Sequence, residues 1–328
     1  MCLCAWFNAT FKGGLFLGSS MTDYDVVIVG GGCAGLAAAL YAKRYDLRTV
    51  VYAKELGGLI TTTHIVENYP GIKPMSGWDM MDKFIEQMKL FDVEVVEKPV
   101  ERIERTNEHF VVEVGGEAVH TKTVIYATGT YHRELEVPGE KEYANKGLSY
   151  CATCDGALHR GKRMVIAGGG DSAAKEALLL SDYAEHVFIV ARSTLKPEPI
   201  NGKRVAEKDN ITVIEHNTIA EVCGDGGTVT HVVLNEEFEG SNELAVGAVF
   251  VAIGHIAQTD LAKPVGVEMN KKGEILIDKA SRTNVPGFYG AGDCTDTAWK
   301  QAIISAAEGS QAANSAYEDI TGGVVEPK

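Results

Sequence analysis

The sequence predicts an α/β protein built from two similar halves, and three observations support this prediction. Two glycine-rich turns, GGGCAG at residues 30–35 and GGGDSA at residues 168–173, each stand between a β-branched apolar run and an alanine-rich stretch. A strand followed by a tight turn and a helix is the unit of parallel sheets covered by helices. The 328 residues are also enough for two domains of ordinary size.

The first half opens on an apolar run that predicts a strand at residues 25–29, followed by a helix at 34–44 and a second strand at 48–52. A further helix is expected over residues 78–90. Shorter apolar runs then predict strands near residues 93–96, 100–105, 110–114 and 123–127.

The second half repeats this order of elements. It predicts a strand at residues 163–167, a helix at 172–180 and a strand at 187–190. After it come strands at residues 248–253 and 287–289 and a helix from residue 300 to about 317.

Composition and charge narrow the class of protein. Hydrophobic residues make up 45% and charged residues 23%, as in soluble globular proteins. The formal net charge of −14, with no basic stripe, argues against a nucleic-acid partner. No apolar run is long enough for a transmembrane helix, so we expect no membrane partner.

The seven cysteines include only one closely spaced pair that is placed like a redox motif. An odd number of mostly scattered cysteines is a poor disulfide framework for a secreted domain, so we expect a cytoplasmic protein. Residues 1–20 are apolar but lack the basic start and the cleavage site of a signal peptide. We expect them to be an N-terminal extension outside the fold.

The first glycine turn has the spacing of a dinucleotide-binding fingerprint. Gly30 permits the tight turn, Gly32 lets the backbone approach a pyrophosphate, and Gly35 lets the helix pack on the strand. An acidic residue about twenty positions later normally holds the ribose hydroxyls. Glu55 is the nearest candidate, slightly beyond the expected end of the second strand.

The second turn carries the same fingerprint in the form Gly168, Gly170 and Ala173. The strand that follows it ends at Arg192 without a carboxylate. An arginine there attracts a 2′-phosphate, which favours NADPH over NADH. The alternative is that Arg192 is an ordinary surface arginine.

The tetrapeptide CATC, from Cys151 to Cys154, is the most informative motif in the chain. Its spacing favours reversible disulfide formation. Half of a zinc site is the alternative, but a structural zinc needs two more ligands and the sequence offers no second pair, so we expect no metal. Asp155 follows directly and is a candidate to give a proton to a departing thiolate; aspartate also favours the N-cap position of a helix, and the two roles are compatible. GAGD at residues 290–293 adds a carboxylate, Asp293, after a predicted strand.

Together these motifs closely resemble the low-molecular-weight thioredoxin reductases of bacteria and archaea. The resemblance runs from about residue 22 to the C-terminal region. The matching pieces are VGGGCAGLAAALYA, VENYPG, ATGT, SYCATCDG, GGGDSAAKEA, VAIGH, GFYGAGD and WKQAIISAAEG.

The resemblance implies two Rossmann-like domains, the second inserted into the first. Each is a three-layer (ββα) dinucleotide-binding domain. Residues 21–130 and 257–328 would form the FAD domain, and residues 131–256 the NAD(P)H domain that carries the cysteine pair. Besides the glycines of the first turn, the FAD site would include Glu55, Gly58, Asn68, Asp293, Gln301 and Ala302. The nucleotide site would include Gly170, Asp171, Ser172, Ala173 and Arg192.

The resemblance also implies a route for the electrons. Hydride passes from the nicotinamide to FAD, and reduced flavin opens the disulfide. Cys154 lies against the flavin, whereas Cys151 attacks the disulfide of thioredoxin or a thioredoxin-like protein. The family further implies a homodimer and a rotation of one domain about two hinges near Thr130 and His255.

One departure leaves the electron donor open. Family members that use NADPH usually carry His-Arg-Arg after the strand of the second turn, whereas this chain has Ala191, Arg192 and Ser193. Lys196 is the only nearby substitute. NADPH is therefore the first expectation, with NADH or a donor such as reduced deazaflavin as alternatives.

Overall fold

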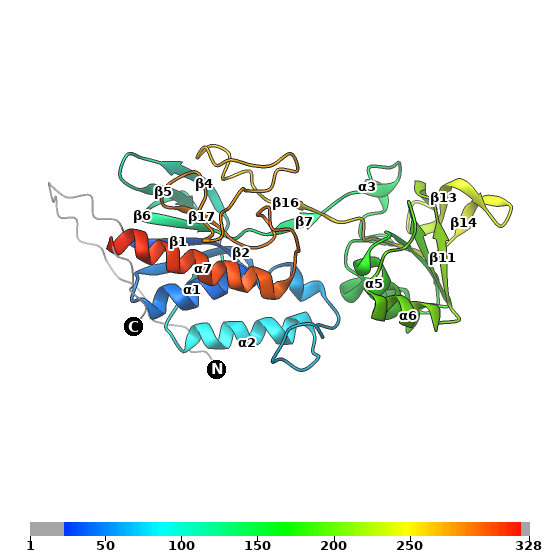
Figure 1. Cartoon of the computed structure of the whole chain (residues 1–328). Helices are drawn as coiled ribbons and strands as arrows, with labels where there is room; N and C mark the ends of the chain where they lie inside the picture. The colour runs from blue at the N-terminus through cyan, green and yellow to red at the C-terminus, as the bar shows by residue number, and fades with distance from the viewer. Residues whose placement is uncertain (1–22, 323–328) are drawn as a thin grey trace, which may run out of the picture.

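The computed structural model describes residues 23–322, so the extension predicted at residues 1–20 lies outside the described part of the chain. The described residues form two lobes joined by a narrow connection (Figure 1). The first lobe holds both ends of the described chain, and the second lobe holds its middle. No helix within residues 23–322 is long and apolar enough to cross a membrane.

The first lobe is built on a sheet with a parallel centre. Strands β1 (Tyr24–Gly31) and β6 (Glu117–Tyr126) lie side by side in the middle of this sheet. Three further strands extend the parallel pairing, and an antiparallel hairpin extends one edge. The other strands are β2 (Thr49–Leu56), β3 (Glu94–Val96), β4 (Val100–Arg105), β5 (Phe110–Val114) and β17 (Phe288–Gly290).

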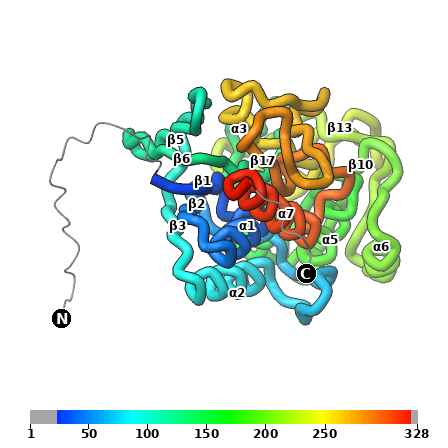
Figure 2. The backbone as a smooth tube through the Cα atoms, turned by 60° about the vertical axis from the view of Figure 1, so that its left-hand side comes forward, coloured from blue at the N-terminus to red at the C-terminus, as the bar shows by residue number. Residues whose placement is uncertain are grey.

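Three helices cover one face of this sheet: α1 (Cys33–Arg44), α2 (Gly77–Lys89) and α7 (Ala302–Thr321). Helices α1 and α7 lie side by side along their length (Figure 2). They cross so closely that a Cβ on Gly309 would lie 2.0 Å from the carbonyl oxygen of Ala34. The small residues of both helices therefore allow the contact that seals this face of the core.

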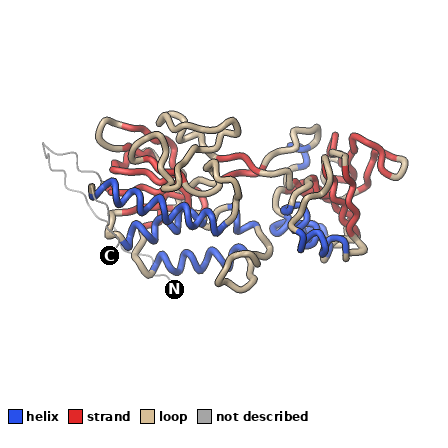
Figure 3. The backbone as a smooth tube through the Cα atoms, in the orientation of Figure 1, coloured by secondary structure: helices blue, strands red, loops and turns tan. Residues whose placement is uncertain are grey.

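The second lobe has three layers. Its parallel sheet contains β8 (Leu148–Ser149), β9 (Arg163–Ala167), β10 (His186–Ala191), β11 (Ile211–Glu215) and β15 (Ala248–Val251). An antiparallel sheet of β12 (Ile219–Gly224), β13 (Val229–Phe238) and β14 (Ser241–Ala245) packs on one face through Val222 and Val232. Helices α5 (Asp171–Ser181) and α6 (Pro199–Ala206) lie on the other face (Figure 3). This arrangement confirms the predicted α/β class with Rossmann-like elements.

Two short strands connect the lobes. The chain leaves the first lobe through β7 (Thr130–His132) and returns through β16 (His255–Ala257), and the two pair antiparallel (Figure 1). Four short segments complete the fold: η1 (Leu59–Thr62), α3 (Glu140–Tyr143), α4 (Ala152–Asp155) and η2 (Gly156–His159).

Some predicted boundaries were wrong. The second strand runs on to Leu56 instead of ending near Tyr52, because the pairing of β1 with β2 shifts between Val29 and Gly31. The last helix occupies Ala302–Thr321 and not residues 300–317. The antiparallel layer β12–β14 and helix α6 were not predicted at all.

Candidate active site

The first glycine turn has a backbone that larger residues cannot adopt. Gly30 has φ +119°, and a Cβ there would lie 2.1 Å from the carbonyl oxygen of Ala127. A Cβ on Gly35 would lie 1.9 Å from the carbonyl oxygen of Gly30. Both glycines are therefore required by the close approach of α1 to β1 and β6.

Gly32 is placed differently, because it faces open space. It is the N-cap of α1, whose first turn has neither a side-chain cap nor an acidic residue. A Cβ on Gly32 would meet nothing nearer than 3.8 Å, where the Cα of Gly58 lies. Gly58 has φ +67° and brings a second loop against this helix end. The free amides and the bare backbone fit a pyrophosphate.

Glu55 lies nearer to this turn than its sequence position suggests. The shifted pairing places Leu56 of β2 opposite Gly31, whereas Tyr52 lies opposite Val29. Between these two paired positions the chain advances two residues along β1 but four residues along β2. The shift carries the exposed Glu55 back to the end of the strand beside the glycine turn, where an acidic residue contacts a ribose in dinucleotide folds.

Polar groups from distant parts of the chain gather at the same end of the sheet. Asp293 is mostly buried, and it accepts a hydrogen bond of 3.2 Å from Ser305 Oγ on α7. Its burial raises its pKa above the ordinary value, although this hydrogen bond opposes the shift. Asn68 Nδ2 donates to Gln301 Oε1 at 3.0 Å, directly before α7 begins at Ala302. The donors, the carboxylate and the glycine cradle together fit FAD.

The second glycine turn repeats this geometry in the second lobe. Gly170 is the N-cap of α5, and a Cβ there would meet nothing within 4 Å. Ala173 is fully buried beneath Gly168, whose Cβ would lie 3.0 Å from that of Ala173. Gly169 packs against Ala191 at the end of β10, so the exposed Arg192 follows directly beside the turn. Ser172 is exposed in the first turn of α5.

Asp171 holds this turn to α6. Its carboxylate accepts hydrogen bonds from the backbone nitrogen of Glu198 at 2.7 Å and from Asn201 Nδ2 at 2.8 Å. It also pairs with Lys175 at 2.8 Å. Burial alone would raise the pKa of Asp171, but these partners outweigh burial and lower it. Asp171 therefore shapes the predicted nucleotide site through its neighbours.

Cys151 and Cys154 are joined by a disulfide, with their Cα atoms 5.3 Å apart. Cys151 is the N-cap of α4, and its Sγ accepts a hydrogen bond of 3.1 Å from the backbone nitrogen of Cys154. Cys151 is half-buried, whereas Cys154 is exposed. Helix α4 lies beside η1 of the first lobe, which follows Gly58. The disulfide thus lies where the two lobes meet.

The carboxylate of Asp155 is linked to the backbone of Cys151 through Ser149. Its Oδ2 accepts a hydrogen bond of 2.6 Å from Ser149 Oγ, which in turn accepts one of 3.0 Å from the backbone nitrogen of Cys151. Asp155 also precedes η2, but its side chain makes no capping hydrogen bond there. Asp155 thus occupies the N-cap position of η2 without a side-chain cap, and its carboxylate bonds to Ser149 instead.

Comparison with known proteins agrees with this arrangement. Residues 24–309 match the family described as pyridine nucleotide-disulphide oxidoreductase. The chain belongs to this family. It is 36% identical over 298 residues to the thioredoxin reductase of Listeria innocua, covering 90% of this chain and 93% of the relative.

Solved structures also show similarity to thioredoxin reductases over nearly the whole length of the oxidoreductase. The crystal structure of Lactococcus lactis thioredoxin reductase in the FR conformation superimposes with a TM-score of 0.88 at 34% identity. The match covers 92% of this chain and 100% of that one. The predicted resemblance to low-molecular-weight thioredoxin reductases is thereby confirmed.

Longer relatives also match. The oxidoreductase is 35% identical over 297 residues to the NADH dehydrogenase of Bacillus subtilis, covering 90% of this chain. It spans only 58% of the length of that relative.

Sequence reasoning missed three groups of the oxidoreductase that bond to predicted site residues or to residues that hold them in place. Ser149 lies within the quoted motif SYCATCDG but was given no role. Glu308 on α7 accepts hydrogen bonds from the backbone nitrogen of Gly292 at 2.8 Å and from Thr295 Oγ1 at 3.3 Å, and so fixes the loop that carries Asp293. Arg204, which contacts the neighbours of Asp171, lies on the unpredicted helix α6. Ser149 and Glu308 lie inside motifs that match the family, and that position was the only signal in the sequence that could have identified them. Arg204 lies in no such motif.

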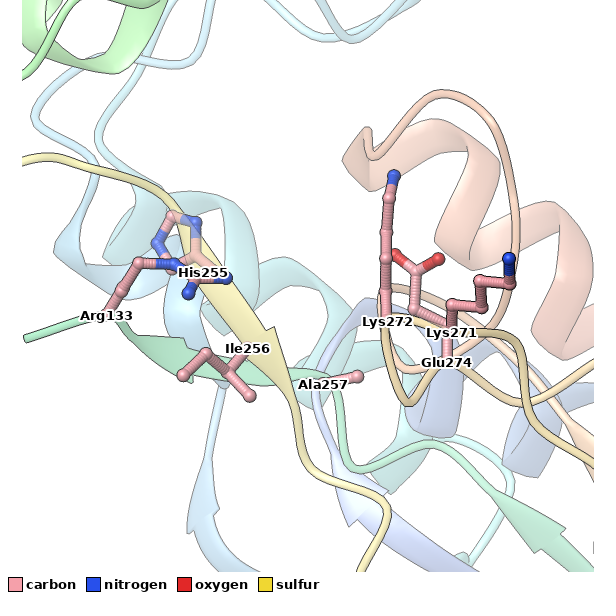
Figure 4. A pocket seen from close by; sticks show the side chains of 7 residues that line it. All are labelled: Arg133, His255, Ile256, Ala257, Lys271, Lys272 and Glu274. Carbon is pink, nitrogen blue, oxygen red and sulfur yellow. The ribbon is translucent and has the colours of Figure 1, made fainter. Parts of the chain in front are cut away.

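A separate cavity of about 440 Å³ lies beside the strands that connect the lobes (Figure 4). Arg133 and His255 line one side of this cavity, and Lys271, Lys272 and Glu274 line the other. The rings of His132 and His255 lie 5.0 Å apart across the paired hinge strands. Burial lowers the pKa of both histidines. None of the predicted site residues lines this cavity, which lies beside β7 and β16.

Proposed function

We propose that the protein passes electrons from a nicotinamide nucleotide, through FAD, to the Cys151–Cys154 disulfide and on to thioredoxin or a thioredoxin-like protein. The observation that carries this proposal is the disulfide itself, which lies on α4 beside η1, close to the glycine cradle of the first lobe. The similarity to a thioredoxin reductase over nearly the whole length of both chains supports the acceptor.

We assign FAD to the first lobe (residues 23–130 and 257–322 of the described chain) and the nicotinamide nucleotide to the second (residues 131–256). When bound, FAD accepts a hydride and supplies two electrons to the disulfide. Gly32 and Gly58 would hold its pyrophosphate, and Glu55 its ribose. Asn68, Gln301, Ala302 and Asp293 would hold the remaining polar groups at the start of α7.

The dithiol chemistry follows from the cysteines. After two-electron reduction, the thiolate of Cys151 attacks a disulfide of the partner protein. One partner sulfur then bonds to Cys151, and the other leaves as a thiolate that takes a proton from Asp155. Cys154 next attacks the sulfur of Cys151 and releases the second partner sulfur. The products are a reduced partner and the reformed Cys151–Cys154 disulfide.

NADPH is the donor we favour, because Arg192 lies exposed beside the second glycine turn and no carboxylate ends β10. A guanidinium at this position attracts a 2′-phosphate. NADH is the second candidate, since the chain lacks the further arginine of the usual pattern and is similar to an NADH dehydrogenase. The open turn at Gly170 favours either nicotinamide over a donor such as reduced deazaflavin.

The direct test of the donor is anaerobic titration of the purified yellow protein with NADPH, NADH and reduced deazaflavin, with flavin bleaching as the readout. Rapid bleaching by NADPH alone is the expected result. Equal rates with both nicotinamides would remove NADPH preference from the proposal. A colourless protein that takes up no FAD would refute the proposal as a whole.

The test of the acceptor uses Cys151→Ser. This variant should still be reduced at the flavin by the nicotinamide but should lose the reduction of thioredoxin. Normal turnover of thioredoxin by this variant would contradict the role of Cys151. We also infer a cytoplasmic homodimer from the family, which sedimentation of the purified protein would test.

A further inference from the structure

The segment before the cysteines is held on both sides. Strand β8 pairs with β15, so that Leu148 lies opposite Val249 and Ser149 opposite Phe250. Tyr150 then donates a hydrogen bond of 2.8 Å to Glu140, whose carboxylate is 2% exposed and also accepts two backbone amides. The backbone that enters the dithiol loop is therefore fixed before Cys151 begins it.

Ser149 is the residue of this segment that reaches across the loop. Its hydroxyl has one proton, and the acceptor at 2.6 Å, Asp155 Oδ2, lies closer than the alternative acceptor, the carbonyl oxygen of Cys151 at 3.4 Å. The same oxygen accepts the backbone N–H of Cys151 at 3.0 Å. Ser149 thus joins the carboxylate of Asp155 to the backbone of Cys151 through a single atom. Its side chain is 6% exposed overall, so water competes poorly for these bonds.

A short aspartate side chain at the end of a one-turn helix has several rotamers, and most of them do not aim at the sulfurs. Proton delivery to a leaving thiolate needs the carboxyl within hydrogen-bond reach of that sulfur. The hydrogen bond from Ser149 fixes the carboxylate of Asp155 to the same oxygen that binds the backbone nitrogen of Cys151. No other hydrogen bond to this carboxylate competes with it in the described part of the chain.

We propose that Ser149 is a positioning residue of the dithiol site, which holds the carboxylate of Asp155 toward the two cysteines. This inference rests on the proposed function, because it assigns Ser149 to the proton-transfer step at this disulfide. Ser149 neither contacts the partner nor exchanges electrons. It acts through Asp155, so removing it should matter only while Asp155 is present.

The influence of Asp155 on the cysteines has to be separated from that of other charged groups near α4. Helix α4 packs against η2, which carries His159, and against α5, which carries Asp171, Lys175 and Glu176. It also packs against η1, which has no charged residue. His159 lies near enough to Asp155 for the two charges to interact, and its Nδ1 is buried without a hydrogen-bond partner.

The test is the rate at which iodoacetamide alkylates the reduced protein, measured from pH 5 to pH 10. A carboxylate held beside a thiol opposes formation of the thiolate. Ser149→Ala should therefore move the midpoint of the alkylation profile to lower pH by about one unit. Asp155→Asn should move it by a similar amount, and the double variant should move it no further. Ser149→Thr, which keeps the hydroxyl, should restore the profile.

Two controls complete the design. Tyr150→Phe removes the hydrogen bond to Glu140 from the residue next to Ser149 and should leave the midpoint in place. His159→Phe should not reproduce the shift of Ser149→Ala. With thioredoxin as substrate, Ser149→Ala should lower kcat about tenfold with little change in KM, as the loss of a hydrogen bond to a charged group suggests.

The proposal would be overturned if the alkylation profile of Ser149→Ala were the same as that of the unmodified protein. It would also be overturned if the midpoint shift of the double variant equalled the sum of the shifts of Ser149→Ala and Asp155→Asn. The alkylation readout needs neither thioredoxin nor a nicotinamide. A failure of the assigned acceptor or donor would therefore leave this result standing, and the two failures are distinguishable.

Discussion

Arg204 of α6 and Glu67 of the first lobe form an ion pair across the boundary between the lobes, with Arg204 Nη1 2.5 Å from Glu67 Oε1. Arg204 Nη2 donates to Glu67 Oε2 at 3.3 Å, so both carboxylate oxygens are engaged. The ion pairs found between other residues of the described chain join groups within one lobe. Arg204 also donates to Asn201, which binds Asp171 at the nucleotide turn.

The first prediction concerns this ion pair. The rotation of the lobes that the resemblance implies would break this ion pair, so we expect Arg204→Gln to shift the equilibrium between orientations away from the arrangement seen here. Because both side chains are partly exposed, we expect a change of only about two- to fivefold in that equilibrium. Small-angle X-ray scattering at low salt measures the shift. Lys208→Gln, which loses a pair inside the second lobe, is the control. Identical scattering from Arg204→Gln and the unmodified protein would contradict the prediction.

A second prediction separates folding from FAD binding at the first glycine turn. Gly32→Ala should fold normally, because its Cβ would meet nothing nearer than 3.8 Å, but should bind FAD at least about tenfold more weakly because the methyl group obstructs the pyrophosphate. Gly35→Ala should fail to fold, since its Cβ would lie 1.9 Å from a carbonyl oxygen. Circular dichroism and flavin absorbance after dialysis measure the two properties. Gly227→Ala in an exposed turn should change neither, and full FAD retention by Gly32→Ala would argue against the assigned site.

The third prediction tests the nucleotide contact of Arg192. Arg192→Gln should raise KM for NADPH about tenfold and leave KM for NADH unchanged, because only NADPH offers a 2′-phosphate to the guanidinium. Steady-state kinetics with both nucleotides checks this. Lys203→Gln removes an exposed positive charge from α6 and serves as the matched control. Equal effects on the two nucleotides would show that Arg192 acts only through general charge.

The fourth prediction concerns Glu176 on α5, whose buried Oε2 has no hydrogen-bond partner within residues 23–322. Burial raises its pKa from an ordinary 4.5 to about 8. The folded state therefore keeps a proton that the unfolded state releases above pH 4.5. The stability contributed by the neutral carboxyl is complete below that pH and is lost as the pH rises to about 8.

Glu176→Gln removes this titration. It should leave the free energy of unfolding nearly unchanged at pH 4.5 and raise it by about 4–5 kcal/mol at pH 8.5, as a shift of this size implies. Urea unfolding at the two pH values measures the difference. Glu207→Gln, an exposed residue of the same lobe, should show no such dependence. A pH-independent effect of Glu176→Gln would mean that this carboxyl does not titrate as inferred.

Local stereochemistry explains what the sequence determined by itself. The fold class, both glycine turns and the cysteine pair follow from short motifs, because the allowed φ of Gly30, the contact distance at Gly35 and the spacing of Cys151 and Cys154 depend on a few neighbouring residues. Those features were predicted without knowledge of distant contacts.

Tertiary structure alone decided the rest. The place of Glu55 depends on a shift in the pairing of β1 with β2, and the aim of Asp155 depends on β8 being paired with β15. The partners Glu67 and Arg204 are 137 residues apart and meet only because the lobes pack. Hydrogen bonds and ion pairs of this kind need atoms within about 3 Å. Periodicity in a single sequence carries no record of which distant side chains the packing brings that close.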